Sequence, residues 1–299
     1  MNRIFLIVNP AAGRGRMRAK LPRLLETFRA RGVSRVYETS AAGEEGTFAR
    51  RAIDEGAATI VAVGGDGTCG RIANAIMRSS SRCRLAVIPS GTGNDFAKTL
   101  GVEKHDPVRI ADLVMRGADT RIDVGLADGT YFLNSCGFGF DPSVLEASNK
   151  SLFLKGDAVY IYSALRQLFT YRGIDVSVSG ALGVKRDPML MVTISNGRFL
   201  GGAFKIAPRA SVLDGKLDAC FFRDSGVIER VRLFAGAMRG THLSMPSVAS
   251  ASVDQLTLSF ATNPLMEIDG ELHRAGSRTV EVRCIPRALS VIAAPGAVL

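Results

Sequence analysis

Over roughly the first 120 residues, short apolar runs alternate with longer segments in which apolar residues recur at helical spacing. The runs 4–8, 59–63 and 85–88 show no alternation of polar and apolar positions, which is typical of strands buried in a parallel sheet. The amphipathic segments between them predict helices, for example over 21–28. This order of elements predicts a parallel, three-layer α/β domain.

Three further elements are expected in this half of the chain. A short strand is predicted at 33–37, a helix around 48–53 that ends at Gly56, and a helix over 108–114 that ends at Gly117. They fit the same alternation of strand and helix.

The pattern changes near residue 121. Asp128 and Gly129 form a hairpin signal, and helical spacing follows from about 142 to 171, including 158–169. Beyond it the pattern predicts mostly strands, at 175–179, 189–195, 216–222, 255–260, 265–268, 279–284 and 288–292. We therefore expect an α/β domain over 1–122 and a β-sandwich-like domain over 123–299, whose last strand can return to the first domain. The active site is expected in the cleft between the two.

The strand predicted at 59–63 leads directly into the sequence Gly-Gly-Asp-Gly-Thr at 64–68, and helical spacing resumes over 72–77. Glycine in such a strand-to-helix turn lets the backbone turn sharply and lets an anion approach the N–H groups of the helix start. A second glycine-rich loop, Pro-Ser-Gly-Thr-Gly-Asn-Asp at 89–95, follows the strand at 85–88. Two such loops predict a site for a ligand with several phosphates.

Residues 65–70 also match the G-x-G-x-x-G pattern of dinucleotide-binding Rossmann folds. In that fold an acidic residue about 20 positions further on holds the ribose, but here the next strand ends in Pro89 and Ser90. Asp66 would also place a carboxylate beside a pyrophosphate, which is repulsive unless a cation intervenes. Mg²⁺-bound ATP meets this requirement, so we favour Mg-ATP over NAD.

The charge of the chain favours anionic partners. The net charge is +10 and the isoelectric point is near 9.7, which suits nucleotide phosphates or acidic lipid headgroups. Scattered solubilising arginines are the plainer explanation, because no block of five like charges occurs. A nucleic-acid partner is not expected, since there is no helix-turn-helix, zinc or RNP signature and no Trp.

The spacing of the cysteines and histidines and the lengths of the apolar segments indicate which classes of protein and of chemistry the sequence supports. The five cysteines are scattered without a C-x-x-C pair, which is typical of reduced thiols in a cytoplasmic protein. The three histidines have no metal-pair spacing, so zinc or histidine-triad chemistry is poorly supported. The apolar run at 4–8 is too short for a signal peptide, and no segment approaches membrane-spanning length. Membrane contact is therefore expected to be peripheral.

These motifs resemble those of the diacylglycerol kinase catalytic-domain family, the bacterial lipid kinases related to sphingosine and ceramide kinases. They occur in family order: NPAAG at 9–13, GGDGT at 64–68, PSGTGNDFA at 89–97, DVG at 123–125, FLNSCGFGFD at 132–141, LDGKLD at 213–218 and IDGE at 268–271. GGDGT alone also occurs in NAD kinases and phosphofructokinases. The combination with the other motifs is far more specific and spans nearly the whole chain.

The resemblance implies roles for individual residues. It implies that ATP is held by Asn9, Pro10, Ala11, Ala12, Gly13, Thr39, Gly65, Asp66, Gly67, Thr68, Cys69, Gly70, Arg71 and Thr92. It further implies Glu271 as the proton acceptor for the lipid hydroxyl, and Asp66, Asp95 and Asp123 as carboxylates of a Mg²⁺-and-water network. A separate structural Mg²⁺ site is implied at Asp214 with the backbone carbonyls of Ser211 and Lys216.

One departure from the family pattern concerns the residues after GGDGT. The family usually continues with x-Asn-Glu, whereas this chain has Gly70 and Arg71. We consider three interpretations: Arg71 binds phosphate directly, the site is tuned to an unusual lipid, or the chain is a degenerate kinase. The third ranks last because the other acidic residues are all present.

Each candidate residue also has a purely structural interpretation. Asp66 can stabilise a glycine-rich turn, Asp95 can be a helix N-cap, and Asp214 can be a hairpin residue. Glu271 can be a solvated residue after the turn at Asp269 and Gly270, and Asp269 is its rival as the base. From spacing alone the structural reading is favoured for Asp214 and Glu271, and the resemblance reverses it.

Together these observations predict an ATP-dependent lipid kinase at the inner face of an anionic membrane. The acceptor can be diacylglycerol, a ceramide or sphingoid base, or another lipid alcohol, and a homodimer is one assembly that the sequence allows. The alternatives are an enzyme similar to NAD kinase and a non-catalytic lipid- or nucleotide-binding protein.

Overall fold

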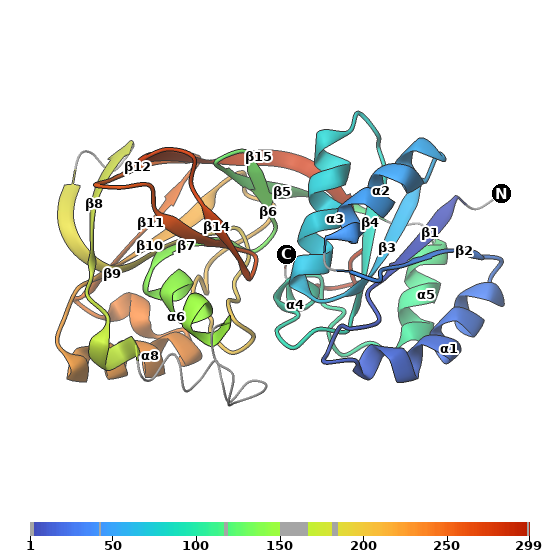
Figure 1. The fold of residues 1–299 in the computed structure, drawn as a ribbon, viewed down its shortest axis with the longest axis horizontal. Coiled ribbons are helices and arrows are strands. Elements are labelled where there is room, and N and C mark those ends of the chain that lie inside the picture. Colours follow the sequence, from blue (N-terminus) through green and yellow to red (C-terminus); the bar gives the residue numbers. More distant parts are fainter. Residues whose placement is uncertain (1–2, 42, 117–118, 150–166, 181–184, 298) are drawn as a thin grey trace. The chain divides into compact units, whose positions relative to one another are not determined.

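A computed structural model describes residues 3–41, 43–116, 119–149, 167–180, 185–297 and 299 (Figure 1). The chain divides into two compact units. Unit 1 comprises Met1–Val124, Val212–Asp214 and Pro286–Leu299, and unit 2 comprises Gly125–Ser211 and Gly215–Ile285.

Unit 1 is an α/β domain built on a parallel sheet. Its strands are ordered β2-β1-β3-β4, and Val291 of β15 pairs in parallel with Leu85 of β4. The helices α1 and α5 contact each other on one face of the sheet, and α2 and α3 contact each other on the other face (Figure 1). The elements are β1 (Ile4–Val8), α1 (Arg16–Arg29), β2 (Arg35–Glu38), α2 (Glu44–Asp54), β3 (Thr59–Gly64), α3 (Asp66–Arg78), β4 (Arg84–Pro89), α4 (Asp95–Thr99) and α5 (Pro107–Arg116).

The apolar runs that predicted strands are the centre of this sheet. Every residue of β1 and β3 is buried, because helices cover both faces. The sequence prediction of a parallel three-layer domain is therefore confirmed.

Unit 2 is a β-sandwich with antiparallel strands. Its elements are the end of β5 (Thr120–Ala127), β6 (Thr130–Phe132), β7 (Ser135–Gly139), α6 (Phe140–Asn149), β8 (Ile174–Gly180), β9 (Lys185–Ser195), β10 (Leu217–Arg223), α8 (Val227–Arg239), the 3-10 helix η1 (His242–Ser244), β11 (Val248–Val253), β12 (Gln255–Phe260), β13 (Leu265–Ile268), β14 (Glu271–Arg274) and the start of β15 (Thr279–Val291).

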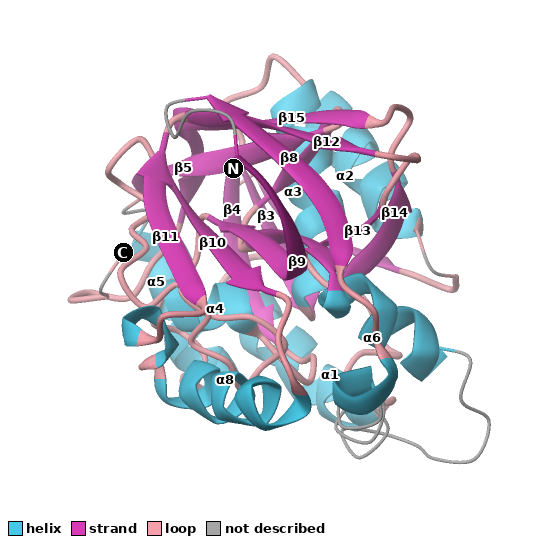
Figure 2. Ribbon diagram, turned by 90° about the vertical axis from the view of Figure 1, so that its left-hand side faces the viewer, coloured by secondary structure: helices cyan, strands magenta, loops and turns pink. Residues whose placement is uncertain are grey.

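The long strand β9 joins the two layers of this sandwich. Its first residues pair with β8, and its later residues pair with β7 and β10. The core between the layers contains residues from both, and Phe138 stacks on Phe260 with ring centroids 5.2 Å apart. The helices α6 and α8 lie on the same side of these strands (Figure 2).

The structure differs from the expected elements of the second half in several places. Three strands, β7, β11 and β14, and the helix α8 were not predicted, and the segments expected at 279–284 and 288–292 form one strand, β15. Part of the helical segment expected at 142–171 is present as α6 and as the helical residues 167–170. The rest of it lies outside the described residues.

Candidate functional site

Three glycine-containing loops meet at one edge of the sheet in unit 1. They follow β1, β3 and β4, whose carboxyl ends share this edge. A methyl group on Gly13 would place its carbon 2.4 Å from the carbonyl oxygen of Ser90, and one on Gly91 would lie 2.6 Å from Cα of Gly65. Only glycine permits such backbone contact, so the two loops singled out in the sequence pack directly on each other.

The helix α3 begins inside this cluster of loops. Its N-cap residue is Gly65, which has no side chain to accept a hydrogen bond, and its first helical bond runs from Cys69 N to Gly65 O. The N–H groups of the first turn therefore face the loops without a side-chain cap, and with the helix dipole they favour an anion at this position. The buried residues Thr68, Cys69 and Gly70 continue into the helix.

Asp66 and Asp95 lie close together in this region. Asp66 accepts a hydrogen bond from the backbone N–H of Phe96 (2.9 Å), and Asp95 pairs with Lys98 at 2.7 Å. Burial raises the pKa of Asp66, and the neighbouring Asp95 carboxylate raises it further, against the N–H groups of residues 95 and 96 and the Lys98 ammonium. Two carboxylates that repel each other in this way are suited to share a cation.

One structural interpretation of Asp95 is wrong. The N-cap residue of α4 is Asn94, whose backbone is left-handed (φ 51°), and Asp95 is the first residue of the helix. The Asn94 side chain accepts from the N–H of Gly91 (2.8 Å) and donates to its carbonyl (2.9 Å), which closes the second glycine-rich loop. Asp95 is instead buried beside Lys98.

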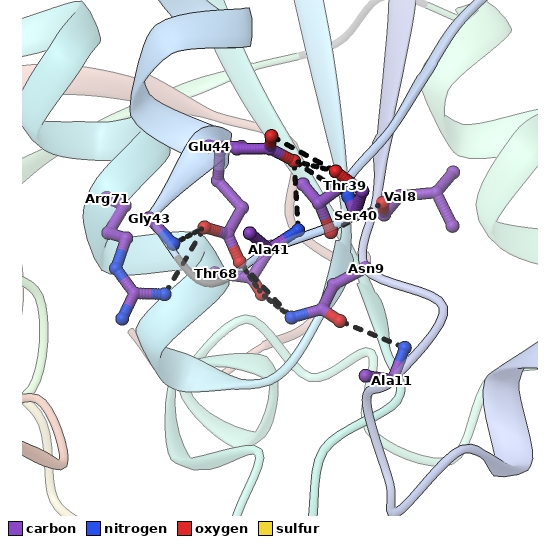
Figure 3. A network of polar contacts seen from close by, with 11 residues as sticks. Val8, Asn9, Ala11, Thr39, Ser40, Ala41, Gly43, Glu44, Thr68 and Arg71 are labelled. Carbon is purple, nitrogen blue, oxygen red and sulfur yellow. Dashed lines mark hydrogen bonds and ion pairs between the residues drawn. The ribbon is translucent and has the colours of Figure 1, made fainter.

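A polar network joins the loop after β1 to the start of α2 and α3 (Figure 3). The centre of this network is Glu45, whose side chain is fully buried. Its Oε1 accepts from Asn9 Nδ2 (3.1 Å) and Thr68 Oγ1 (3.3 Å), and its Oε2 accepts from Gly43 N (3.0 Å) and Arg71 Nη1 (3.3 Å). Sequence reasoning missed Glu45, because a glutamate in the first turn of an amphipathic helix is usually a surface residue.

The remaining residues expected to hold ATP are also in this part of unit 1. The N–H of Ala11 donates to Asn9 Oδ1 (3.0 Å), and the N–H of Thr39 donates to Val8 O (2.9 Å). Ala12 and Gly13 are buried, Pro10 and Gly67 are half-buried, and Thr92 is exposed. The structure thus brings the loops that carry these residues to one edge, and their contacts with a nucleotide stay a prediction.

Asp123 has a structural role in unit 1. It is fully buried, and its Oδ1 accepts the N–H of Arg287 at 2.7 Å. Arg287 has a left-handed backbone (φ 47°), so this bond stabilises a strained turn in the returning C-terminal segment. A further role in a Mg²⁺ network stays a prediction.

The two candidate bases differ in their surroundings within unit 2. Asp269 is buried, and its carboxylate accepts the N–H groups of Leu133 (2.7 Å), Asn134 (2.8 Å) and Ser135 (3.2 Å). Glu271 is the first residue of β14, pairs with Ile268 across the hairpin and is half-buried. Asp269 therefore organises the backbone of the loop before β7, while Glu271 has a more accessible side chain.

A second pair of carboxylates is buried next to this hairpin. Glu267 and Asp141 converge over Gly137: a methyl carbon there would lie 2.6 Å from Asp141 Oδ2 and 3.4 Å from Glu267 Oε2. Glu267 also accepts the N–H of Gly270. Burial raises the pKa of Glu267 well above its usual range, and the carboxylates of Asp141 and Asp269 raise it further.

The residues expected to form a structural metal site lie at the turn formed by residues 212 and 213. Ser211 is half-buried, and Asp214 and Lys216 are exposed. Across the described ranges, no group of three or more His, Cys, Asp or Glu side chains is arranged to hold a metal ion. A site of one carboxylate and two backbone carbonyls stays a prediction.

An apolar cavity lies in unit 2 between α8, the start of α6 and the strands β9 and β10. Its wall includes Phe140, Leu190, Phe204, Phe222 and Leu233. The charged residues in the wall are Asp141 and Arg230, and Arg230 pairs with Asp224 at 2.6 Å.

Among the residues that the structure describes, no helix is long and apolar enough to cross a membrane.

Family models match both halves of the chain. The model described as the diacylglycerol kinase catalytic domain matches residues 3–127, and the YegS C-terminal NAD kinase beta sandwich-like domain matches residues 134–293. Together they span nearly the whole chain.

Individual relatives agree with these matches. The chain is 29% identical over 275 residues to a diacylglycerol kinase of Bacillus subtilis (strain 168), covering 91% of this chain and 90% of the relative. It is 27% identical over 268 residues to one of Staphylococcus aureus (strain bovine RF122 / ET3-1), covering 89% and 85%. A crystal structure of a diacylglycerol kinase from Bacillus anthracis str. Sterne has the same fold, with a TM-score of 0.76 at 21% identity over 99% of this chain and 98% of the other.

Proposed function

Because this chain belongs to the diacylglycerol kinase catalytic-domain family, we propose that this kinase transfers the γ-phosphate of ATP to a hydroxyl group of a membrane lipid. The observation that carries the proposal is the backbone contact between the glycine-rich loops around the uncapped start of α3. Such a site offers N–H groups and a helix dipole to a chain of phosphates.

The nucleotide would lie against the loops after β1, β3 and β4. Gly65 and Gly67 have no side chain, so the phosphates can reach the backbone at the start of α3. Asn9, Thr68 and Arg71 are linked through Glu45, which supports a preformed loop structure. Thr39 and Thr92 are the outer members of this proposed set.

The carboxylates in unit 1 fit a magnesium ion. Asp66 and Asp95 are oxygen ligands whose mutual repulsion a divalent cation would relieve. A bound Mg²⁺ would neutralise charge on the transferred phosphate. Asp66 and Asp95 would hold the ion, and Asp123 is proposed as a further member of the network.

The apolar cavity of unit 2 supports a lipid as the acceptor. A hydrocarbon chain gains free energy when it leaves water for such a wall, by about 0.8 kcal/mol for each buried CH₂. The side chains that line this cavity between α8 and the strands β9 and β10 are mainly apolar. Diacylglycerol, ceramide or a sphingoid base would all satisfy these walls, and the net charge of +10 supports peripheral contact with an anionic membrane.

We propose Glu271 as the base that accepts the proton of the lipid hydroxyl. A hydroxyl is a weak nucleophile at neutral pH, so a nearby carboxylate assists its attack on phosphorus. Asp269 is less suited, because three backbone N–H groups already bind its two oxygens.

The test is a transfer assay with radiolabelled ATP in vesicles that contain diacylglycerol, ceramide or sphingosine, beside an arm with NAD as acceptor. We expect labelled lipid, and a Glu271→Gln variant that is slower by about 10²–10⁴-fold with unchanged ATP affinity. Labelled NAD without labelled lipid would favour an enzyme similar to NAD kinase. ATP binding without any transfer would favour a binding protein, and near-full turnover of Glu271→Gln would reject this base.

A further inference from the structure

Glu45, the buried glutamate at the start of α2, forms an ion pair with Arg71, the residue that departs from the family pattern. Arg71 stands where related kinases usually have glutamate, and its guanidinium pairs with Glu45 at 3.3 Å. We infer that Glu45, with Arg71 as its counterion, is a positioning residue that fixes Asn9 and Thr68 for nucleotide binding. This inference rests on the proposed function, since it concerns the same ATP site.

The contacts of Glu45 connect the ends of three neighbouring strands. Gly43 follows β2, Asn9 follows β1, and Thr68 lies in the first turn of α3, which follows β3. These strands are adjacent in the order β2-β1-β3. Both carboxylate oxygens are used, with two donors on each. One side chain therefore sets the relative positions of three loops.

Asn9 shows how this positioning reaches the nucleotide loop. Its Nδ2 donates to Glu45 (3.1 Å), which leaves Oδ1 to accept the N–H of Ala11 at 3.0 Å. The orientation of the amide is thus decided by Glu45 at one end and transmitted to the loop backbone at the other (Figure 3). Thr68 also donates to Glu45. A methyl carbon on Gly64 would lie 2.4 Å from Thr68 Oγ1, so the Thr68 side chain packs directly against the end of β3.

Charge explains why an arginine accompanies this glutamate. A buried carboxylate next to a phosphate site would repel the ligand and would be costly without a counterion. Arg71 neutralises Glu45 from the neighbouring helix, with 31% of its own side chain exposed. The guanidinium of Arg71 and the carboxylate of Glu45 thus form an ion pair between α3 and α2.

The competing interpretation is that Arg71 binds phosphate directly, and the two make opposite predictions for a double-mutant cycle. If Arg71 is the counterion, Arg71→Gln leaves Glu45 as an uncompensated charge beside the phosphates, and adding Glu45→Gln removes that charge. If Arg71 is a phosphate ligand, the double variant stays as weak as Arg71→Gln.

The experiment measures ATP affinity by calorimetry for Glu45→Gln, Arg71→Gln and the double variant, at a temperature where thermal unfolding shows each to be folded. We expect the dissociation constant to rise about tenfold in each single variant, and the double variant to be more than about tenfold tighter than the product of the two effects predicts. The double variant should also bind ATP more tightly than Arg71→Gln.

The chain offers a matched control pair on the same helix. Arg51 and Glu55 form an exposed ion pair at 3.0 Å, with 65% and 39% of their side chains accessible. We expect Glu55→Gln, Arg51→Gln and their double variant to change ATP affinity by less than about twofold, because exposed pairs contribute little.

Three outcomes would overturn the inference. Unchanged ATP affinity in folded Glu45→Gln would mean a purely structural role, and additive effects would mean that the two residues act separately. A double variant as weak as Arg71→Gln would identify Arg71 as a phosphate ligand. Absence of ATP binding by the unaltered protein would instead overturn the proposed function together with this inference.

Discussion

The two units each bury a glutamate, and they stabilise it in opposite ways. Glu45 in unit 1 has four donors, one of them the guanidinium of Arg71. Glu267 in unit 2 converges with Asp141 over Gly137 and accepts the N–H of Gly270. The first site surrounds a carboxylate with hydrogen-bond donors, whereas the second places it beside other acids.

This difference teaches how the surroundings decide the charge of a buried acid. Burial and the neighbouring carboxylates raise the pKa of Glu267 well above its usual range, which favours its protonated form. Glu45 orients the polar groups that donate to it, which suits a ligand site. A protonated Glu267 is a neutral packing group that costs less to bury.

Asp269 is a third buried acid, and its substitution is expected to have the largest effect on the stability of the fold. Its carboxylate accepts three backbone N–H groups from one loop. Asp269→Asn would turn an amide NH₂ toward at least one of these donors, so we expect the free energy of unfolding to fall by about 3 kcal/mol. Urea denaturation measures this change.

Asp128→Asn is the control for that experiment. Asp128 is exposed and accepts a single N–H, from Gly276 at 2.9 Å, and asparagine tolerates its left-handed backbone. We expect a much smaller loss. Equal losses in the two variants would contradict the role assigned to the three N–H groups.

Glu267→Gln gives an intermediate effect with a pH dependence of known sign. The pKa of Glu267 is higher in the folded chain than its ordinary value of 4.5, so the native state holds a proton that the unfolded chain releases above that pH. The stabilisation by this group is complete below pH 4.5 and is lost as the pH rises through the folded-state pKa. Glutamine resembles the protonated acid, so we expect the variant to have a higher Tm than the unaltered protein at pH 8 and a similar Tm at pH 4.

Glu281, which is exposed on β15, provides the control substitution Glu281→Gln. It should leave the pH dependence of Tm unchanged. A Glu267→Gln variant whose Tm falls by the same amount at both pH values would mean that Glu267 is charged in the folded protein.

The smallest effect is expected for Glu44→Gln, next to Glu45 but in water. Glu44 accepts the N–H groups of Ser40 (2.7 Å) and Ala41 (3.0 Å), which lower its pKa below 4.5. Its stabilisation is therefore present above pH 4.5 and lost as the pH falls through the lowered pKa. Because the group is exposed, thermal unfolding at pH 7 should change little, and a loss comparable with that of Asp269→Asn would contradict the comparison.

The sequence predicted the first unit better than the second because buried parallel strands have an unambiguous pattern. The run at 59–63 and its glycines became β3 and the start of α3 as expected. The helix α8 was missed because its apolar residues lie on more than one side: Leu233 is buried, while Ile228 is 73% exposed. The apolar residues of α8 therefore do not recur clearly at helical spacing.

The site was predictable only where its residues carry a local signal. The glycine-rich turns could be predicted from their local composition, and the family resemblance suggested Glu271 as the base. The partnership of Glu45 with Arg71 joins residues 26 positions apart on different helices, so no local pattern contains it. Pro286 and the left-handed Arg287 made β15 appear as two strands, although the structure has a single strand over Thr279–Val291.

The return of the chain end to unit 1 has a consequence for synthesis on the ribosome. Val291 pairs with Leu85, and the N–H groups of Ile292 and Ala294 donate to Leu85 and Leu100, each at 2.9 Å. The edge of β4 and the bond from Arg287 to Asp123 therefore stay unmade until residues 287–294 have been translated. A nascent chain that has already emerged through residue 124 must wait for residues 286–294 before this sheet is complete, which leaves an open strand edge for chaperones to protect.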